Sequence, residues 1–216
     1  MIAMEIARMI FSPIEVNTYI ISDQTGECAV IDCGCYDRNE FARLESFIES
    51  RNLKPVLLLN THCHLDHIFG NRFMLEKYKL GTYCSREDES NREKAVQHAL
   101  MFGLSMEPPP VPAGFLTDGQ EISFGVTPIE VLHVPGHSRG SLAFYSSNDK
   151  TVFTGDALFA GSIGRTDLPG GDYETLIKSI RTKLFTLPGD TVVYPGHGEK
   201  TTIKKEISSN PFFINT

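Results

Sequence analysis

The sequence predicts an α/β (α+β) fold of two similar halves, each a β-sheet covered by helices on its outer face. The first observation is the order of the segments, because strand-like alternation is followed by helical periodicity, and this order then occurs again. The second is composition, since 41% hydrophobic and 22% charged residues over 216 positions are ordinary for a globular protein. We expect one domain over residues 1–216.

Three strands are expected first, at residues 5–11, 17–22 and 27–32, where apolar and polar residues alternate. The sequence Asp-Gln-Thr-Gly at residues 23–26 is typical of a hairpin turn. Residues 37–40, Asp-Arg-Asn-Glu, resemble a capping box. The helix predicted after them has its apolar side chains on one face, at Phe41, Leu44, Phe47 and Ile48.

The remainder of the first half combines one buried strand with two helices. A continuous apolar run at residues 56–59 suits a strand that is buried on both faces. Helices are predicted at residues 69–79 and 88–102. Residues 107–114 contain four prolines and therefore predict an extended connector. Because motifs of metal-binding type lie on both sides of it, we interpret it as a surface crossing within one domain.

The second half begins with strands at residues 121–124, 127–133, 141–146 and 151–154. A helix follows at residues 172–185, with a buried face formed by Leu176, Ile177, Ile180 and Leu184. A last strand at residues 191–194 precedes a short C-terminal helix.

Charge and composition exclude several classes of function. The net charge of −7 and a pI near 5.5 disfavour nucleic-acid binding, which needs clustered Lys and Arg. No apolar run exceeds four residues, so no membrane span or membrane partner is expected. The N-terminus lacks the apolar region of a signal peptide, and five cysteines is an odd number for a disulfide framework. We therefore expect a cytoplasmic protein with reduced thiols.

Three of the seven histidines lie close together in Thr61-His62-Cys63-His64-Leu65-Asp66-His67, directly after the strand at residues 56–59. In an extended segment His62 and His64 point to the same side and can share a metal ion. If the chain then turns into a helix, Asp66 and His67 can face a second ion. Without a cation, these crowded groups would suffer desolvation and repulsion. Since imidazole and carboxylate are preferred ligands of divalent metals, the segment predicts a metal site.

Two metal ions need further ligands, and three other predicted strand ends supply them. Each strand is followed by a glycine and then by a potential ligand, and glycine lets the backbone turn the side chain back over the sheet edge. These ligands are His137, Asp156 and His197.

The motifs H-x-H-x-D-H, P-G-H, G-D and P-G-H, in this order, resemble the metallo-β-lactamase superfamily from about residue 5 to the C-terminus. The sequences GSIGRTD at residues 161–167, PGHG at 195–198 and NPF at 210–212 resemble its small glyoxalase II-like (hydroxyacylglutathione hydrolase-like) branch. The resemblance implies a four-layer αββα sandwich, with two mixed sheets covered by helices and the metals at one sheet edge.

The resemblance also implies the ligand set. His62, His64 and His137 would bind the first metal, Asp156 would bridge, and the second metal would have Asp66, His67 and His197. The cofactors would be two divalent ions, with zinc expected and iron or manganese as alternatives. Asp66 stands where dizinc lactamases often have a cysteine, which favours the hydrolase branch.

The expected function is a metallo-hydrolase that cleaves a small-molecule thioester such as an S-acylglutathione. Two ions would lower the pKa of a shared water from 15.7 toward roughly 7, and the hydroxide would attack the carbonyl carbon. Asp66 could orient this hydroxide as a catalytic residue. Arg165 could bind a substrate carboxylate, or pair with Asp167 or Asp172. Because the chain ends about 19 residues after His197, we expect no C-terminal glutathione-binding domain of the kind that larger thioesterases carry.

Two alternatives use the same site. Persulfide dioxygenases of this superfamily share the ligand residues and a similar Gly-Arg-Thr-Asp segment, and they hold one iron by two histidines and an aspartate. Here His62 or His64, together with His137 and Asp156, could hold that iron. A lactonase is the other alternative.

Other candidate residues have simpler interpretations. His133 and His98 are predicted to be a structural histidine and a helix-surface histidine. Cys63 should point away from the metals toward the core. Cys33 and Cys35 are interpreted as buried thiols, with a redox role left open.

Overall fold

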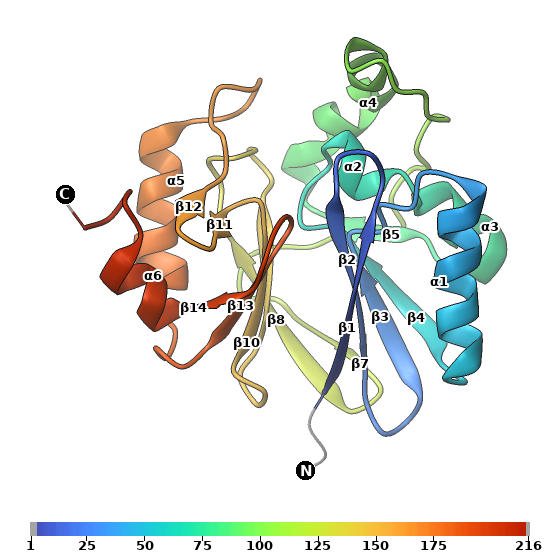
Figure 1. Cartoon of the computed structure of the whole chain (residues 1–216), viewed down its shortest axis with the longest axis horizontal. Coiled ribbons are helices and arrows are strands. Elements are labelled where there is room, and N and C mark those ends of the chain that lie inside the picture. The colour runs from blue at the N-terminus through green and yellow to red at the C-terminus, as the bar shows by residue number, and fades with distance from the viewer. Residues whose placement is uncertain (1–3, 215–216) are drawn as a thin grey trace.

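Two six-stranded sheets face each other at the centre of the structure, and helices cover the outer face of each (Figure 1). This computed structural model describes residues 4–214. Both sheets contain parallel and antiparallel pairs. The predicted four-layer αββα sandwich of two mixed sheets is therefore confirmed.

The first sheet contains the N-terminal strands in sequence order. It is formed by β1 (Glu5–Phe11), β2 (Val16–Ser22), β3 (Glu27–Ile31), β4 (Lys54–Leu59), β5 (Thr82–Cys84) and β6 (Gly114–Phe115). The helices of this half are α1 (Arg38–Ser50), α2 (Leu65–Ile68), α3 (Asn71–Tyr78) and α4 (Glu89–Met101), the last preceded by a 3₁₀ turn at Arg86–Asp88. Figure 1 shows α1 and α3 on the outer side of this sheet.

The second sheet has the order β14-β13-β10-β9-β8-β7. Its strands are β7 (Glu121–Phe124), β8 (Thr127–His133), β9 (Leu142–Ser146), β10 (Thr151–Gly155), β13 (Val192–Pro195) and β14 (Thr201–Thr202). A small hairpin joins β11 (Leu158–Phe159) to β12 (Ser162–Ile163). The outer face of the second sheet is covered by α5 (Tyr173–Ser179) and by α6 (Ile203–Ser209) (Figure 1). Helix α5 continues as a π-helical segment at Ile180–Leu184.

Alternating side chains on the central strands supply three hydrophobic layers. On β2, Ile20 packs toward α1 and α3, whereas the next residue, Ile21, enters the core between the sheets. On β10, Phe153 joins that same central core and Val152 packs toward α5 and α6. A register slip of one residue would exchange these faces, so this pattern fixes how the strands pair.

The predicted strands and helices are present, with some different ends. The helix after residues 37–40 begins as expected, because the Asp37 side chain accepts hydrogen bonds from the backbone N–H groups of Asn39 and Glu40. The second half of the predicted capping box is wrong, because the Glu40 carboxylate does not bond back to the backbone N–H of Asp37. It accepts hydrogen bonds from the backbone N–H groups of Ser12 and Tyr36. It thereby ties α1 to the end of β1.

The helix predicted at residues 69–79 is different in the structure. Helix α2 begins earlier, at Leu65 inside the metal motif, and α3 begins at Asn71. Between them Gly70 lies so close to Cys33 that an added Cβ would be 2.4 Å from the Cys33 Sγ atom. The glycine lets α2 approach the end of the first sheet.

None of the helices within residues 4–214 combines the length and apolar character that crossing a membrane requires.

Candidate metal centre

The seven candidate ligands come from both halves and meet where strands of the two sheets end. The segment after β4 contributes His62, His64, Asp66 and His67, the last two from the short helix α2. The loops after β8, β10 and β13 contribute the other three, which are His137, Asp156 and His197. The structure brings all seven together in three overlapping groups whose ligand atoms lie within 4.8 Å of one another.

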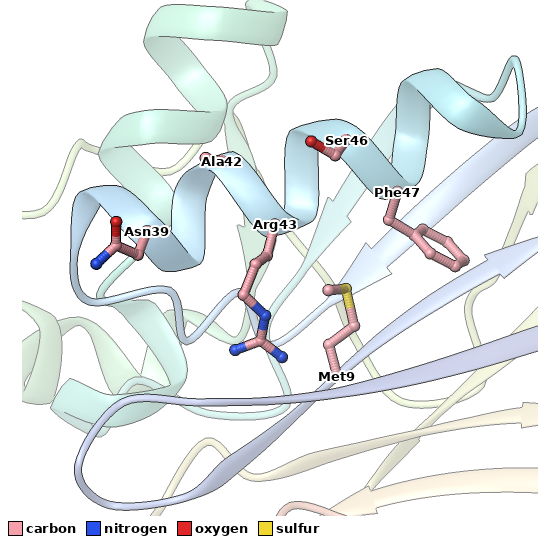
Figure 2. Close-up of a pocket in the computed structure, with 6 residues that line it drawn as sticks. All are labelled: Met9, Asn39, Ala42, Arg43, Ser46 and Phe47. Atoms are coloured by element: carbon pink, nitrogen blue, oxygen red, sulfur yellow. The ribbon is translucent and has the colours of Figure 1, made fainter.

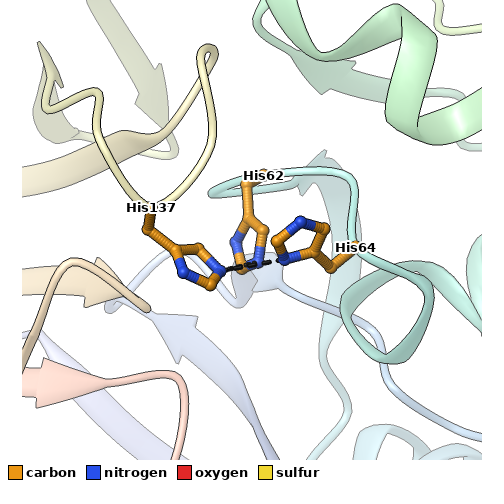
Figure 3. A group of neighbouring side chains, drawn as sticks. All are labelled: His62, His64 and His137. Carbon is orange, nitrogen blue, oxygen red and sulfur yellow. Dashed lines mark hydrogen bonds between the residues drawn. The ribbon is translucent and has the colours of Figure 1, made fainter. Parts of the chain in front are cut away.

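Three histidines form the first group (Figure 3). The Nε2 atom of His137 lies 3.2 Å from the Nε2 atom of His62 and 2.9 Å from the Nδ1 atom of His64. The rings of His62 and His137 are buried, and that of His64 is half-buried. Neutral imidazole nitrogens that face one another in this way repel through their lone pairs, unless a proton or a metal cation lies between them.

Asp66, His67 and His197 form the second group. The Oδ2 atom of Asp66 lies 3.1 Å from the Nε2 atom of His197 and 3.5 Å from that of His67. Asp156 lies between the two groups. Its Oδ1 atom is 3.4 Å from the Nε2 atom of His67, and its Oδ2 atom is 3.6 Å from the Nε2 atom of His137. One carboxylate therefore faces both groups, as a bridging ligand would.

Two buried polar atoms test whether metal ions fit this site. The Nε2 atom of His67 and the Oδ1 atom of Asp156 are buried, and neither has a hydrogen-bond partner among residues 4–214. Such orphaned groups cost roughly 1–3 kcal/mol each. A cation between them would satisfy both, and a donor set of imidazole and carboxylate suits zinc, iron or manganese. The residues therefore fit a binuclear site of histidine and aspartate ligands.

Burial lowers the pKa of two histidines in the first group, whereas nearby carboxylates raise the pKa of His67 in the second. Burial and the neighbouring imidazoles lower the pKa of His62 well below its usual value, and burial lowers that of His64 to about 3. Both rings are thus unprotonated at neutral pH, the form that binds metal. Burial disfavours charge on His67, but Asp66, Asp32 and Asp156 outweigh it and raise the pKa of His67. The same negative charges favour a metal cation beside this ring.

Asp32 orients His67 and was missing from the predicted site. Its Oδ2 atom lies 2.8 Å from the Nδ1 atom of His67 and accepts a hydrogen bond of 2.6 Å from the Thr61 hydroxyl, while Oδ1 accepts from the Thr61 backbone N–H. This contact leaves Nε2 of His67 free for a metal. Asp32 was expected at the end of the strand predicted at residues 27–32, whereas in the structure it directly follows β3, just as Asp156 directly follows β10. A carboxylate at a strand end was therefore the available signal for Asp32.

Backbone carbonyls orient two of the other ligand rings. The Nδ1 atom of His137 lies 2.8 Å from the carbonyl oxygen of Arg165, and that of His197 lies 3.1 Å from the carbonyl oxygen of Glu15. A carbonyl can only accept, so each Nδ1 carries the proton. The Nε2 atoms consequently present lone pairs to the centre of the site.

Asp88 holds together the two loops that carry the first histidine group, and it was also missed. Its buried carboxylate accepts hydrogen bonds from the backbone N–H of Cys63 at 2.7 Å and of Gly140 at 2.9 Å, and from the Ser138 hydroxyl at 3.1 Å. Cys63 separates His62 from His64, and Ser138 follows His137. Asp88 thus fixes the spacing between loops that belong to different halves.

Glycine is required at all three predicted strand ends. At Gly155, φ is +49° and an added Cβ would lie within 3 Å of the Thr61 side chain. Gly136 has φ = +129°, and an added Cβ there would lie 2.3 Å from backbone atoms of Leu176. At Gly196 an added Cβ would lie 2.2 Å from the Oδ1 atom of Asp156. Gly136 and Gly155 therefore serve both backbone conformation and close packing, and Gly196 serves close packing.

A cavity of about 610 Å³ opens onto the ligand groups. It is lined by His64, Asp66, His137, Asp156 and His197, by residues of α4, and by the loop that contains Arg165. Arg165 pairs with Asp167 through two hydrogen bonds of 2.8 Å, and both side chains are mostly exposed. Of the two alternatives for Arg165, the structure contains the ion pair, although the residue does line the cavity.

The residues set aside lie largely where expected. The Nε2 atom of His133 is 2.9 Å from the carbonyl oxygen of Arg139, and Cys63 is buried with Cys84 away from the metal groups. Cys33 and Cys35 belong to the core beneath α1. A separate groove between β1 and α1 shares none of its lining residues with the cavity (Figure 2); they are Met9, Asn39, Ala42, Arg43, Ser46 and Phe47.

Comparison with known proteins connects this geometry to a family. The family model described as the metallo-beta-lactamase superfamily matches residues 12–197. The hydroxyacylglutathione hydrolase GloC of Haemophilus influenzae is 40% identical over 198 residues, which are 91% of this chain and 92% of that protein.

Two solved structures are similar over nearly the whole chain. The B3 metallo-beta-lactamase BLEG-1 superposes with a TM-score of 0.90 at 31% identity, covering 98% of this chain and all of that one. The protein TTHA1623, solved in a di-iron-bound form, superposes with a TM-score of 0.87 at 37% identity, covering 96% of this chain and all of that one.

Proposed function

Because this chain belongs to the metallo-β-lactamase superfamily and has its histidine-rich metal site, we propose that it is a metal-dependent thioesterase acting on a small thioester such as an S-acylglutathione. The observation that carries the proposal is the pair of ligand groups joined by Asp156 at the floor of an accessible cavity. The similarity to a hydroxyacylglutathione hydrolase supports the thioester as the substrate class.

When bound, two divalent ions would lower the pKa of a coordinated water toward neutrality and would polarise the carbonyl oxygen of the substrate. The protein's own part is to hold these ligands in place. Asp32 and the carbonyls of Arg165 and Glu15 orient the rings, and Asp88 holds the loops. We propose zinc as the resident metal, although the di-iron form of a similar protein makes iron the first alternative to measure.

Asp66 is proposed as the residue that positions the attacking water. Its carboxylate is mostly buried, yet it lines the cavity, and its Oδ2 atom lies 3.1 Å from the Nε2 atom of His197. Burial would raise the pKa of Asp66, but His67 and His197 outweigh this effect and lower it. Asp66 therefore stays ionised and can accept a hydrogen bond from water. A thiolate is a good leaving group, so no strong general acid is needed on the other side.

The test combines metal content with turnover. Protein purified without added metal is analysed for zinc, iron and manganese, and is then assayed for S-lactoylglutathione hydrolysis by release of free thiol. The proposal expects two metal ions per chain and thioester turnover, and it expects Asp66→Asn to lose turnover while it retains the metal of the three-histidine group. Retained turnover in Asp66→Asn would refute the role of Asp66.

Competing functions give different results in the same preparation. One iron per chain with oxygen uptake on glutathione persulfide would indicate the persulfide dioxygenase. Turnover of a lactone or of a β-lactam without thioester turnover would indicate a lactonase or a lactamase. Since all five cysteines are free and buried, we further propose that the protein works in a reducing compartment, the cytoplasm.

A further inference from the structure

One wall of the cavity over the metal groups is a single face of α4. Asn91, Lys94, His98 and Met101 recur at intervals of three and four residues and all line the cavity. This spacing places them in one row along the helix. Asp88 directly precedes α4, and its carboxylate accepts hydrogen bonds from both loops that carry the first histidine group, so the row is held at a fixed position relative to that group.

A smaller side pocket of about 170 Å³ adjoins the cavity along this row. It shares Asn91, Lys94, His98 and Pro169 with the cavity, and Arg139 lines it as well. The side chain of Arg139 packs against Gly170, where an added Cβ would lie 3.5 Å from the Arg139 Cγ atom. The cavity and the side pocket together form one path from the candidate ligands outward, between α4 and the loop after β12 that contains Arg165.

The cations of this path differ in how they are paired. Arg165 is engaged by Asp167 through two hydrogen bonds. Lys94 and Arg139 form no ion pair with any residue in the described range 4–214. The side pocket contains one carboxylate, that of Glu87, whose Oε2 atom lies 3.8 Å from the Nε2 atom of His133. Two unpaired cations therefore face a small polar pocket.

We propose that this side pocket is a carboxylate subsite, in which Lys94 and Arg139 bind a carboxylate of the substrate remote from the scissile bond. The inference rests on the proposed thioesterase function and specifies its substrate class as an anionic thioester. The carbonyl group would lie at the metal groups, and the carboxylate would lie along the α4 row. Three apolar residues line the cavity but not the side pocket and would contact the uncharged half of the molecule; they are Ile14, Leu65 and Phe102.

The experiment compares three thioesters that differ in the place of a carboxylate. S-acetyl-N-acetylcysteamine has none, S-acetyl-3-mercaptopropionate has one on the thiol half, and S-succinyl-N-acetylcysteamine has one on the acyl half. The variant Lys94→Gln/Arg139→Gln is compared with Lys205→Gln, which removes an exposed charge on α6, and with Arg165→Gln.

The double variant should raise KM for one of the two carboxylated thioesters by roughly five- to thirtyfold, the range for charge-assisted hydrogen bonds at a partly exposed site. The kinetic constants for the neutral thioester should stay unchanged, as should all constants of Lys205→Gln. The carboxylated substrate that responds identifies the half that carries the charge. Equal KM changes for neutral and carboxylated substrates would overturn the subsite, as would a selective loss in Arg165→Gln alone.

A binding measurement separates failure of the subsite from failure of the proposed function. If the wild-type protein hydrolyses none of the three thioesters, the thioesterase proposal is wrong. Calorimetric titration with three thioethers then tests the subsite alone: S-methyl-N-acetylcysteamine has no carboxylate, S-methyl-3-mercaptopropionate has one on the thiol half, and S-(3-carboxypropyl)-N-acetylcysteamine has one on the acyl half. Preference for either carboxylated thioether that is lost in the double variant supports the subsite, and absence of preference for both refutes it.

Discussion

Replacing Asp88 tests whether one buried carboxylate holds the two halves of the metal centre in register. The variant Asp88→Ala removes the acceptor for the backbone N–H groups of Cys63 and Gly140 and for the Ser138 hydroxyl. These donors flank His62, His64 and His137. The substitution leaves every candidate ligand in the sequence, so any loss of metal affinity must come from the geometry of the loops or from the lost charge; Asp88→Asn removes the charge with little change of shape.

The expected magnitude follows from those contacts. Two backbone N–H groups left buried without an acceptor cost about 1–3 kcal/mol each, and part of this cost is offset because a buried carboxylate is no longer desolvated. We expect a net loss of about 2–5 kcal/mol in the free energy of unfolding. That is a large part of the roughly 5–15 kcal/mol that stabilises a typical domain. Metal affinity at the three-histidine group should fall about 10- to 100-fold, as for other residues that orient metal ligands.

The two effects are measured separately. Urea denaturation of metal-depleted protein gives the stability change, and titration against a chromophoric chelator gives the metal affinity. Glu93→Gln, which changes an exposed carboxylate on α4, is the matched control and should stay within about 0.5 kcal/mol of wild type. Asp88→Asn keeps the shape of the side chain and provides a milder variant. Wild-type stability and metal affinity in Asp88→Ala would refute the role of this carboxylate.

Three further predictions concern the metal ions and the residues around them. Metal removal with a chelator should abolish turnover and lower the melting temperature, and added Zn²⁺ or Fe²⁺ should restore both; turnover by metal-free protein would contradict the proposed mechanism. Asp32→Asn should weaken metal binding beside His67 by about 10- to 100-fold in a metal titration, because the ring loses its charged partner; an unchanged affinity would show that the ring is held without it. Gly136→Ala should destabilise the protein by about 2 kcal/mol or more in urea, since the new Cβ would collide with the backbone of Leu176. Gly103→Ala also has a positive φ, +70° against +129° at Gly136, but open space around it, so it measures a backbone cost without a collision; equal losses in both variants would exclude the collision.

The candidate ligands, which the structure brings together, could be picked out from the sequence because their signals are local. Four candidate ligands lie within the six residues 62–67, and each later candidate follows a strand and a glycine. Asp32 contacts His67, which is 35 positions away in the chain, and Asp88 contacts Cys63, which is 25 positions away. The roles of both carboxylates therefore depend on how the strands are arranged in space. Only the folded structure, in which the strands are paired into sheets, distinguishes these two carboxylates from ordinary residues at turns and helix starts.

The short strands were missed for a related reason. Strands β6, β11, β12 and β14 have two residues each, and β5 has three, which is too short for any alternation to be read. They form because a neighbouring strand offers hydrogen bonds, as Val193 does for Thr201. Gly70 illustrates the same limit, since its break between α2 and α3 depends on the nearby Cys33.

The division of the ligands between the halves has a consequence for protein synthesis. Asp66 and His197 are 131 residues apart in the chain, and His62 and His137 are 75 apart. A nascent chain that has emerged only as far as β9 carries the ligands of residues 62–67 and His137, but neither Asp156 nor His197. If a metal ion binds tightly only to the complete set of ligands, it binds late in folding. It would then shift the equilibrium for docking of the two halves toward the native state by mass action. The supply of metal would then determine how long newly made chains stay exposed to proteases.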